Sequence, residues 1–312
     1  MGSRLHARIG TIRQLEILLA VYDGGSIKAA AESLHLTQPT VSMQLKKLVD
    51  AIGMPIYDQV GRRLVFTEAG LAIVATAREV LESFQRLDMH LSDMRGLKAG
   101  TLKLAVVTTS KYFIPHLLGP FCERYPNVDI QFKVGNREQI MKRLNDGSDD
   151  FYVFSHVPED VDIDRIEFLP NPLVAIAAQT HPFAKKKNID IKELLQQPFL
   201  MREKGSGTRH ALEQFLKREG LKPNTKMTIE SNEAIKHAVM ANLGVSVLSV
   251  HSLAFGGDDG LAVLNVKQLP VTSNWYFVWL RQKQQSVIAE TFLQYLHTEG
   301  REMLANEIER LR

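Results

Sequence analysis

The segment 26–53, SIKAAAESLHLTQPTVSMQLKKLVDAIG, constrains the fold of this chain more than any other part of it. Ser26 and Thr37 can each N-cap a short helix, and Pro39 falls in a first helical turn, where it costs no hydrogen bond. The second helix has one apolar face, with residues at three- and four-residue steps: Val41, Leu45, Leu48 and Ile52. Two short helices joined by a tight turn at 34–36 are typical of a helix-turn-helix.

The other face of that second helix carries polar side chains that can hydrogen-bond to the phosphates or bases of DNA. These side chains are Gln38, Thr40, Ser42, Gln44 and Lys47. A short segment of strand character, 57–66, follows and contains Gly61-Arg62-Arg63, which predicts a β-wing whose arginines reach the DNA backbone or minor groove. An ordinary helical hairpin, with the arginines on a solvated turn, is the alternative for this region.

A helix over 11–22 is predicted to pack behind these two and to complete a winged three-helix module, residues 1–66. A long helix over 67–95 follows, and its apolar residues keep heptad spacing in two series. One series is Ile73, Val80, Leu87 and Met94, and the other is Ala77, Phe84 and Leu91. Such spacing favours a helix that pairs with a copy of itself in a homodimer, the alternative being a helix packed on its own domain.

Residues 96–100 (GLKAG) break this helix like a hinge, and the sequence beyond them has the texture of an α/β domain. Strands and helices alternate over 102–155 and again over 199–248, which predicts two similar lobes with mainly parallel sheets. A late strand over 275–280 is expected to return to the first lobe. We assign residues 101–174 plus 273–299 to lobe I, 175–272 to lobe II and 300–312 to a charged helical tail.

Ligands of open parallel sheets bind beyond the carboxyl ends of the strands, where helix N-termini point. In the first lobe this rule selects Thr108, Thr109, Ser110, Lys111 and Asn136. In the second lobe it selects Arg202, Gly205, Ser206, Gly207, Thr208, Arg209 and Asn232. Small residues at a helix start, surrounded by cationic side chains, suit a carboxylate or a phosphate, so we predict a small anionic ligand. Simple helix capping by the same hydroxyl and amide side chains is the alternative.

The sequence lacks the patterns of common enzyme classes. The segment 205–210 (GSGTRH) has no third glycine of a dinucleotide-binding fingerprint, and neither a phosphate-binding lysine loop nor a GxSxG nucleophile elbow occurs. The ten histidines are scattered, and no cluster has metal-ligand spacing. We therefore expect no enzymatic activity, no metal and no cofactor besides the anionic ligand.

Composition bears on the compartment of the protein and on the end of the chain that meets nucleic acid. Residues 1–66 contain eight basic and five acidic side chains, so they hold the whole formal excess of +3. Cys122 is the single cysteine, and its apolar helical surroundings predict a buried thiol in a reducing compartment. No run approaches the ~20 apolar residues of a membrane span, and no secretory signal is recognisable. We expect a cytoplasmic protein that does not bind membranes.

Residues 11–78 resemble the N-terminal domain of LysR-type transcriptional regulators, notably in VYDGGSI (21–27), LTQPTVS (36–42) and GRR with TEAG (61–70). The resemblance extends over nearly the whole chain. It implies a multidomain fold: a winged helix-turn-helix, a long linker helix and an α/β, two-lobed effector domain of the periplasmic-binding type. The stretches VSMQLKKL, KYFIPHLLGPFCERYPNV and REKGSGTRHALE are most similar to the branch that regulates CO2-fixation (Rubisco) operons.

The resemblance implies roles for individual residues. Gln38, Pro39, Ser42 and Met43 would face the major groove of promoter DNA, and Arg63 with Arg62 the minor groove; many members carry arginine where this chain has Met43. It also implies a homotetramer built from dimers, and an effector that is a phosphorylated sugar, phosphoglycolate or 2-oxoglutarate. A regulator of an unrelated metabolic operon, a solute-binding protein and a metabolic enzyme are the competing interpretations.

Overall fold

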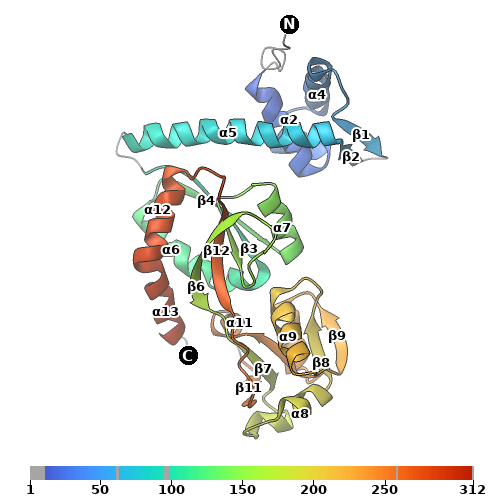
Figure 1. Ribbon diagram of the computed structural model, residues 1–312, viewed down its shortest axis with the longest axis vertical. Helices are drawn as coiled ribbons and strands as arrows, with labels where there is room; N and C mark the ends of the chain where they lie inside the picture. The colour runs from blue at the N-terminus through green and yellow to red at the C-terminus, as the bar shows by residue number, and fades with distance from the viewer. Residues whose placement is uncertain (1–10, 61–62, 95–97, 258, 311–312) are drawn as a thin grey trace. The chain divides into compact units, whose positions relative to one another are not determined.

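The computed structural model describes residues 11–60, 63–94, 98–257 and 259–310. The chain divides into two compact units, Met1–Met94 and Arg95–Arg312, and each has a hydrophobic core of its own (Figure 1).

In the described residues, three helices of the N-terminal unit precede the wing: α2 (Ile12–Gly24), α3 (Ile27–Ser33) and α4 (Gln38–Ile52). Their N-terminal caps are the hydroxyl groups of Thr11, Ser26 and Thr37, each of which accepts a hydrogen bond from a first-turn backbone N–H. The turn between α3 and α4 contains His35 in the left-handed region, with a φ of 55°. The capped helix-turn-helix predicted from the sequence is confirmed.

The core of this unit is formed by residues from all three helices, and these are fully buried: Leu18, Val21, Ala30, Val41, Leu45 and Leu48. Ile52, which the sequence placed on the same apolar face, is only half-buried, because it lies in the last turn of α4. The wing consists of β1 (Tyr57–Val60) and β2 (Arg63–Phe66), an antiparallel pair with Tyr57 opposite Phe66.

The linker helix α5 spans Glu68–Met94. Its first half packs on the core of the N-terminal unit, where Val74 and Ala77 are buried. Its second half presents large apolar side chains that remain exposed: Phe84, Leu87, Leu91 and Met94. The two interpretations of the heptad therefore each describe a part of the helix, packing on its own domain first and an uncovered apolar face afterwards.

The C-terminal unit contains two lobes. Lobe I is a five-stranded sheet in the order β4-β3-β5-β12-β6. Its strands are β3 (Gly100–Val107), β4 (Val128–Gly135), β5 (Phe151–Phe154), β6 (Ile163–Pro170) and β12 (Asn274–Leu280). Its helices are α6 (Ile114–Arg124), α7 (Arg137–Asn145) and α12 (Val287–Tyr295), followed by a π-helical turn and α13 (Arg301–Arg310). Because β12 pairs with β5 and β6, the late strand returns to lobe I, as predicted.

Lobe II is built on β7 (Leu173–Ala178), β8 (Phe199–Arg202), β9 (Thr225–Ile229), β10 (Ser246–Ser249) and β11 (Leu261–Val263). Its helices are α8 (Ile191–Gln196), α9 (Gly207–Arg218), α10 (Asn232–Met240) and α11 (Val250–Ala254), with a 3-10 turn at Pro182–Lys185. A parallel bridge between Phe199 and Val245 connects the β8-β9 pair to the start of β10.

The prediction of mainly parallel sheets is wrong. In lobe I, β3 runs parallel to β4 and β5, but β12 is antiparallel to both of its neighbours. In lobe II, β7 is antiparallel to β10 and β11, and only β8 and β9 form a parallel strand pair. Strands β6, β7 and β11 were not predicted, because they pair only antiparallel in the described sheets and so lie outside the repeating β-α pattern.

Two smaller expectations concern the remaining chain. The tail is helical through Arg310, as predicted. Cys122 is half-buried rather than buried, and this burial raises the pKa of its thiol. Among the helices of the described residues, none is long and apolar enough to span a membrane.

Candidate functional site

The exposed face of α4 carries the side chains predicted to contact DNA. Gln38, Pro39, Ser42, Met43 and Lys47 are exposed, and Thr40 is half-buried beside the capping Thr37. Gln44 is engaged within the fold, because its Oε1 accepts a hydrogen bond from Nε2 of Gln14 at 3.1 Å. The prediction for Arg62 lies outside the described residues, and Arg63 is described only as backbone of β2.

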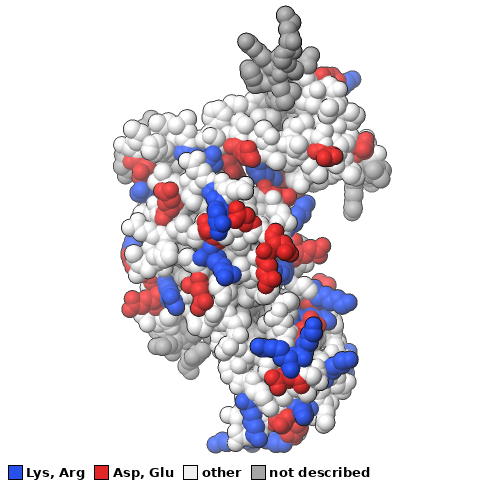
Figure 2. All heavy atoms as spheres, viewed as in Figure 1, with Lys and Arg blue, Asp and Glu red and all other residues white. Residues whose placement is uncertain are grey.

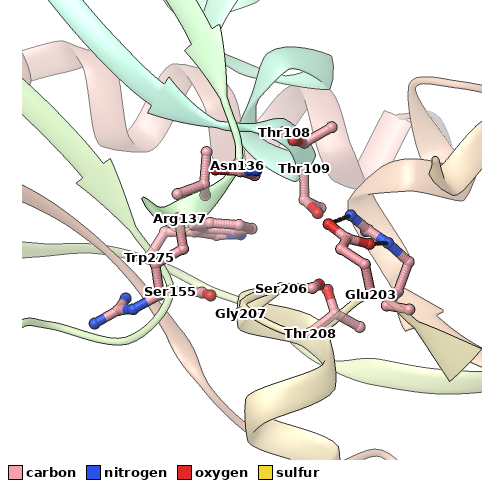
Figure 3. A pocket seen from close by; sticks show the side chains of 12 residues that line it. Thr108, Thr109, Asn136, Arg137, Ser155, Glu203, Ser206, Gly207, Thr208 and Trp275 are labelled. Carbon is pink, nitrogen blue, oxygen red and sulfur yellow. Dashed lines mark hydrogen bonds and ion pairs between the residues drawn. The ribbon is translucent and has the colours of Figure 1, made fainter. Parts of the chain in front are cut away.

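A pocket lies at the carboxyl ends of parallel strands, where the sequence analysis expected a ligand (Figure 3). Its enclosed part is small, about 10 Å³, which is room for one water molecule, and the rest of its space opens to solvent. Seven predicted residues line it: Thr108, Thr109, Asn136, Arg202, Ser206, Gly207 and Thr208. Five lining residues were not predicted: Val107, Arg137, Ser155, Glu203 and Trp275.

The strand topology explains how lobe I contributes to this pocket. The 3-10 helix η1 (Thr108–Tyr112) follows β3, Asn136 caps α7 after β4, and Ser155 follows β5. Trp275 comes from the amino end of β12. Because β12 is antiparallel to β5, it begins where β5 ends, and its first residues lie at the same edge of the sheet.

Arg202, at the end of β8, is the cationic side chain of the pocket wall and is only 3% exposed. Its Nε and Nη2 donate to the two carboxylate oxygens of Glu203, each at 2.8 Å. Its Nη1 donates to Oδ1 of Asn232, and Nδ2 of Asn232 donates to Oγ1 of Thr109 at 3.2 Å. The guanidinium of lobe II is therefore connected to lobe I through one buried amide.

The N-terminus of α9 faces the same pocket with unused hydroxyl groups. Ser206 occupies the N-cap position, but its side chain makes no capping hydrogen bond. Ser206 and Thr208 are both buried, and neither hydroxyl is hydrogen-bonded to any residue that the structure describes. For Asn136 the capping alternative does hold, since its Oδ1 accepts from the backbone N–H of Gln139. The simple capping interpretation thus fails at α9 and describes α7.

Arg137 and Trp275 are two of the lining residues that the sequence did not predict. Arg137 contributes its stem, while its guanidinium turns away from the cavity and donates from Nη1 to the carbonyl oxygen of His156 at 2.6 Å (Figure 3). Burial lowers the pKa of Arg137. Trp275 is buried, and its indole Nε1 finds no hydrogen-bond partner within the described part of the chain.

Five residues predicted for the site do not line the pocket: Ser110, Lys111, Gly205, Arg209 and Asn232. Ser110 donates to the carbonyl oxygen of Val107, and Lys111 lies over the ring of Tyr112. Arg209 donates from Nη1 to the carbonyl oxygen of Arg202, so it contacts the backbone of the site and does not line the pocket. Gly205 supplies a turn with a φ of 88°.

The missed residues were accessible to the same reasoning. Arg137 directly follows Asn136, and Glu203 directly follows Arg202, so the strand-end rule covers both positions. Glu203 is a carboxylate, which does not itself bind an anion, and only the structure shows that it pairs with Arg202. The strand-end rule does not select Trp275, because Trp275 lies at the amino end of β12 and not after the carboxyl end of a strand.

Comparison with known proteins identifies both units. Residues 12–71 match the family profile described as "Bacterial regulatory helix-turn-helix protein, lysR family", and residues 95–301 match "LysR substrate binding domain". The transcriptional activator CmpR of Synechocystis is 47% identical over 287 residues, covering 92% of this chain and 94% of CmpR. A RuBisCO operon transcriptional regulator of Acidithiobacillus ferrooxidans is 38% identical over 290 residues, covering 93% and 94%.

One similar solved structure contains a ligand. The regulatory domain of Synechocystis CcmR, solved in complex with 2-PG, is 45% identical to this chain with a TM-score of 0.60. The alignment covers 63% of this chain and 95% of that domain.

Proposed function

This chain belongs to the LysR family of transcriptional regulators, and on that premise we propose that it controls carbon-fixation genes in response to a small phosphorylated anion. As a member of that family it binds DNA through the N-terminal unit and an effector through the C-terminal unit. Relatives that regulate RuBisCO operons support the choice of target genes. All these relatives are regulators, so we propose no enzymatic activity for the chain.

The start of α9 is the observation that carries the effector proposal. A helix N-terminus concentrates partial positive charge and unpaired N–H groups, and here the hydroxyls of two largely buried residues, Ser206 and Thr208, add unused donors at the pocket. Arg202 supplies a guanidinium fork that fits carboxylate or phosphate. Three kinds of donor around one compact space suit a small dianion better than a neutral ligand.

Basic side chains outnumber acidic ones in lobe II, by thirteen Lys and Arg to nine Asp and Glu over residues 175–272. On the face shown in Figure 2, side chains of both signs lie over this lobe. The formal excess of +4 favours the approach of an anion, while the donors of the pocket act at contact distance.

We propose 2-phosphoglycolate as the effector, because 2-PG is the ligand of the CcmR domain that is 45% identical to this chain. The phosphate would lie at the α9 N-terminus, near Ser206 and Thr208, and the carboxylate toward Thr109 or Asn136. Sugar bisphosphates and 2-oxoglutarate remain the comparison ligands.

For the N-terminal unit we propose that Gln38, Pro39, Ser42 and Met43 face the major groove, with Thr40 and Lys47 contacting the backbone. Arg62 and Arg63 stay in the proposal as wing residues that contact the minor groove. Since promoter binding requires access to the chromosome, the cytoplasm is the compartment that we propose.

We further propose that the second half of α5 pairs with the same helix of another copy. Phe84 and Leu87 are 51% and 52% exposed, and exposed large apolar side chains along one helix face are unfavourable in water. Two paired units would read two half-sites of one operator, and a tetramer would arise from two such dimers.

Titration calorimetry on the full chain tests the effector proposal. We expect 2-phosphoglycolate to bind more tightly than 2-oxoglutarate or ribulose 1,5-bisphosphate. Thr208→Val keeps the shape of the side chain and removes its hydroxyl, and it should weaken binding roughly tenfold. Thr228→Val on the exposed strand β9 is the matched control and should change nothing. Binding of none of the three anions would refute the proposal.

A further inference from the structure

Arg202 and Glu203 form an ion pair inside the proposed effector pocket, and both line its wall. The pair is bidentate, because Nε and Nη2 of the guanidinium each meet one carboxylate oxygen at 2.8 Å. This is the geometry in which an arginine binds a carboxylate or phosphate of a ligand. The groups of Arg202 that are best suited to an anionic effector are therefore occupied by the protein's own carboxylate (Figure 3).

The remaining charges of the pocket do not offset Glu203. The guanidinium of Arg137 points away from the cavity toward the carbonyl oxygen of His156. Lys111 and Arg209 are not among the lining residues. An incoming dianion thus meets one cation that is already paired with a carboxylate, together with the neutral hydroxyls of Ser206 and Thr208.

We propose that Glu203 is an intramolecular competitor of the effector. The anionic group of the effector takes the place of the Glu203 carboxylate on Nε and Nη2 of Arg202, and Glu203 moves out toward solvent. This inference rests on the proposed function, since it assumes an anionic effector in this pocket. It assigns a role to Glu203: this residue sets how tightly an anion must bind Arg202 in order to displace the carboxylate.

Local structure permits the displacement of Glu203. Glu203 lies outside β8, in the turn that leads to α9, and its side chain keeps partial contact with solvent. Two residues later in the same turn, Gly205 has no neighbouring atom within 4 Å of the place where a Cβ would stand. Arg202 stays anchored meanwhile, because Nη1 remains bonded to Asn232 and Nη2 lies 3.4 Å from the carbonyl oxygen of Glu230.

Competition has a consequence for selectivity. An effector gains the free energy of binding Arg202 minus that of the Arg202–Glu203 pair, so a monoanion gains little by replacing another monoanion. A phosphate dianion with further donors at Ser206 and Thr208 gains more. Because a carboxylate monoanion gains less net binding free energy than a phosphate dianion, Glu203 would exclude abundant carboxylates from the pocket.

The test measures 2-phosphoglycolate and inorganic phosphate binding by calorimetry on the full chain and three variants. Glu203→Gln is isosteric, and its amide oxygen can still accept from Arg202, so folding should be preserved. Neutral hydrogen bonds are about half as strong as charge-assisted ones, so we expect both anions to bind roughly tenfold more tightly. Arg202→Ala should weaken binding by at least about tenfold.

The double variant Arg202→Ala/Glu203→Gln separates competition from simple repulsion. If Glu203 competes for Arg202, the double variant stays as weak as Arg202→Ala, because the anion has lost its partner. If Glu203 only repels the ligand through space, the double variant returns to wild-type affinity, which would overturn the inference. Glu138→Gln, an exposed carboxylate beside Arg137, controls for a general change in charge and should leave affinity unchanged.

Failure of the inference and failure of the proposed function give different results. Wild-type binding that is unaltered in Glu203→Gln would overturn the competitor alone. Absence of binding in both proteins would overturn the effector proposal and the competitor with it.

Discussion

Replacing Gly70 by alanine should destabilise the N-terminal unit, although Gly70 lies in the helix α5 and alanine favours helices. A Cβ atom at Gly70 would stand 1.8 Å from the carbonyl oxygen of Ile56, about 1.6 Å closer than ordinary contact. The obstacle is backbone and cannot rotate away. The same Ile56 oxygen also accepts a hydrogen bond from the N–H of Thr67 at 3.1 Å, so moving it disturbs the start of both α5 and the wing.

The magnitude follows from two opposing contributions. Forcing extra atoms into a filled space costs about 1–3 kcal/mol, and a backbone obstacle places this case at the upper end. Alanine returns about 1 kcal/mol of helix propensity relative to glycine. The net loss of about 2 kcal/mol corresponds to a fall of roughly 8–16 °C in the melting temperature of a unit of this size.

The two tryptophans make the assay selective, because Trp275 and Trp279 both lie in the C-terminal unit. Tryptophan fluorescence therefore follows that unit, while far-ultraviolet circular dichroism follows both. We expect Gly70→Ala to lower a melting transition seen by circular dichroism and to leave the fluorescence transition in place. Thr76→Ala, at an exposed position in the same half of α5, is the control and should be neutral or stabilising, because alanine has the higher helix propensity. A Gly70→Ala protein as stable as the wild type would refute the close-contact reasoning.

Three further predictions follow from exposed or titratable residues. Leu87→Glu should weaken self-association at least ~10-fold in sedimentation experiments, because it places a charge on the apolar face of α5; unchanged association would exclude this face. Lys47→Ala should lower the slope of log affinity against log salt by about 0.9 on duplex DNA, as expected for one lost phosphate contact. Burial, with His210 and Arg137 nearby, lowers the pKa of His156, so the unfolded chain takes up a proton first. Stability of the C-terminal unit should thus fall below pH ~6.5, less steeply in His156→Gln, as followed by tryptophan fluorescence at several pH values.

The parts of the fold that the sequence predicted well depend on local chemistry. Thr37, Pro39 and Gly53 mark the start and the end of α4 through capping, a fixed φ and a left-handed φ of 80°. These effects act within a few residues, so the sequence alone determines them. The same holds for Thr67, whose hydroxyl accepts from the N–H of Gly70 at the start of α5.

Features that depend on pairing between distant segments were not predictable in this way. The strand β7 lies between β10 and β11, which are more than sixty residues further along the chain, and its run LVAIAA gives no indication of that partner. The pocket shows the same limit. Arg202 was predicted as a free anion contact, but whether its guanidinium is free depends on the rotamer of Glu203, which no periodicity encodes.

The polar groups behind Arg202 explain how a small ligand could influence both lobes. A ligand shifts a conformational equilibrium only as far as its contacts differ between the two states. The guanidinium is planar and rigid, so Arg202 cannot turn Nε and Nη2 to follow a ligand without also moving Nη1. Since Nη1 donates to Asn232, and Asn232 donates to Thr109 of lobe I, that motion disturbs a contact between the lobes. We therefore infer that a ligand that tilts Arg202 would act on the contact between the lobes through a buried amide that does not itself line the ligand space.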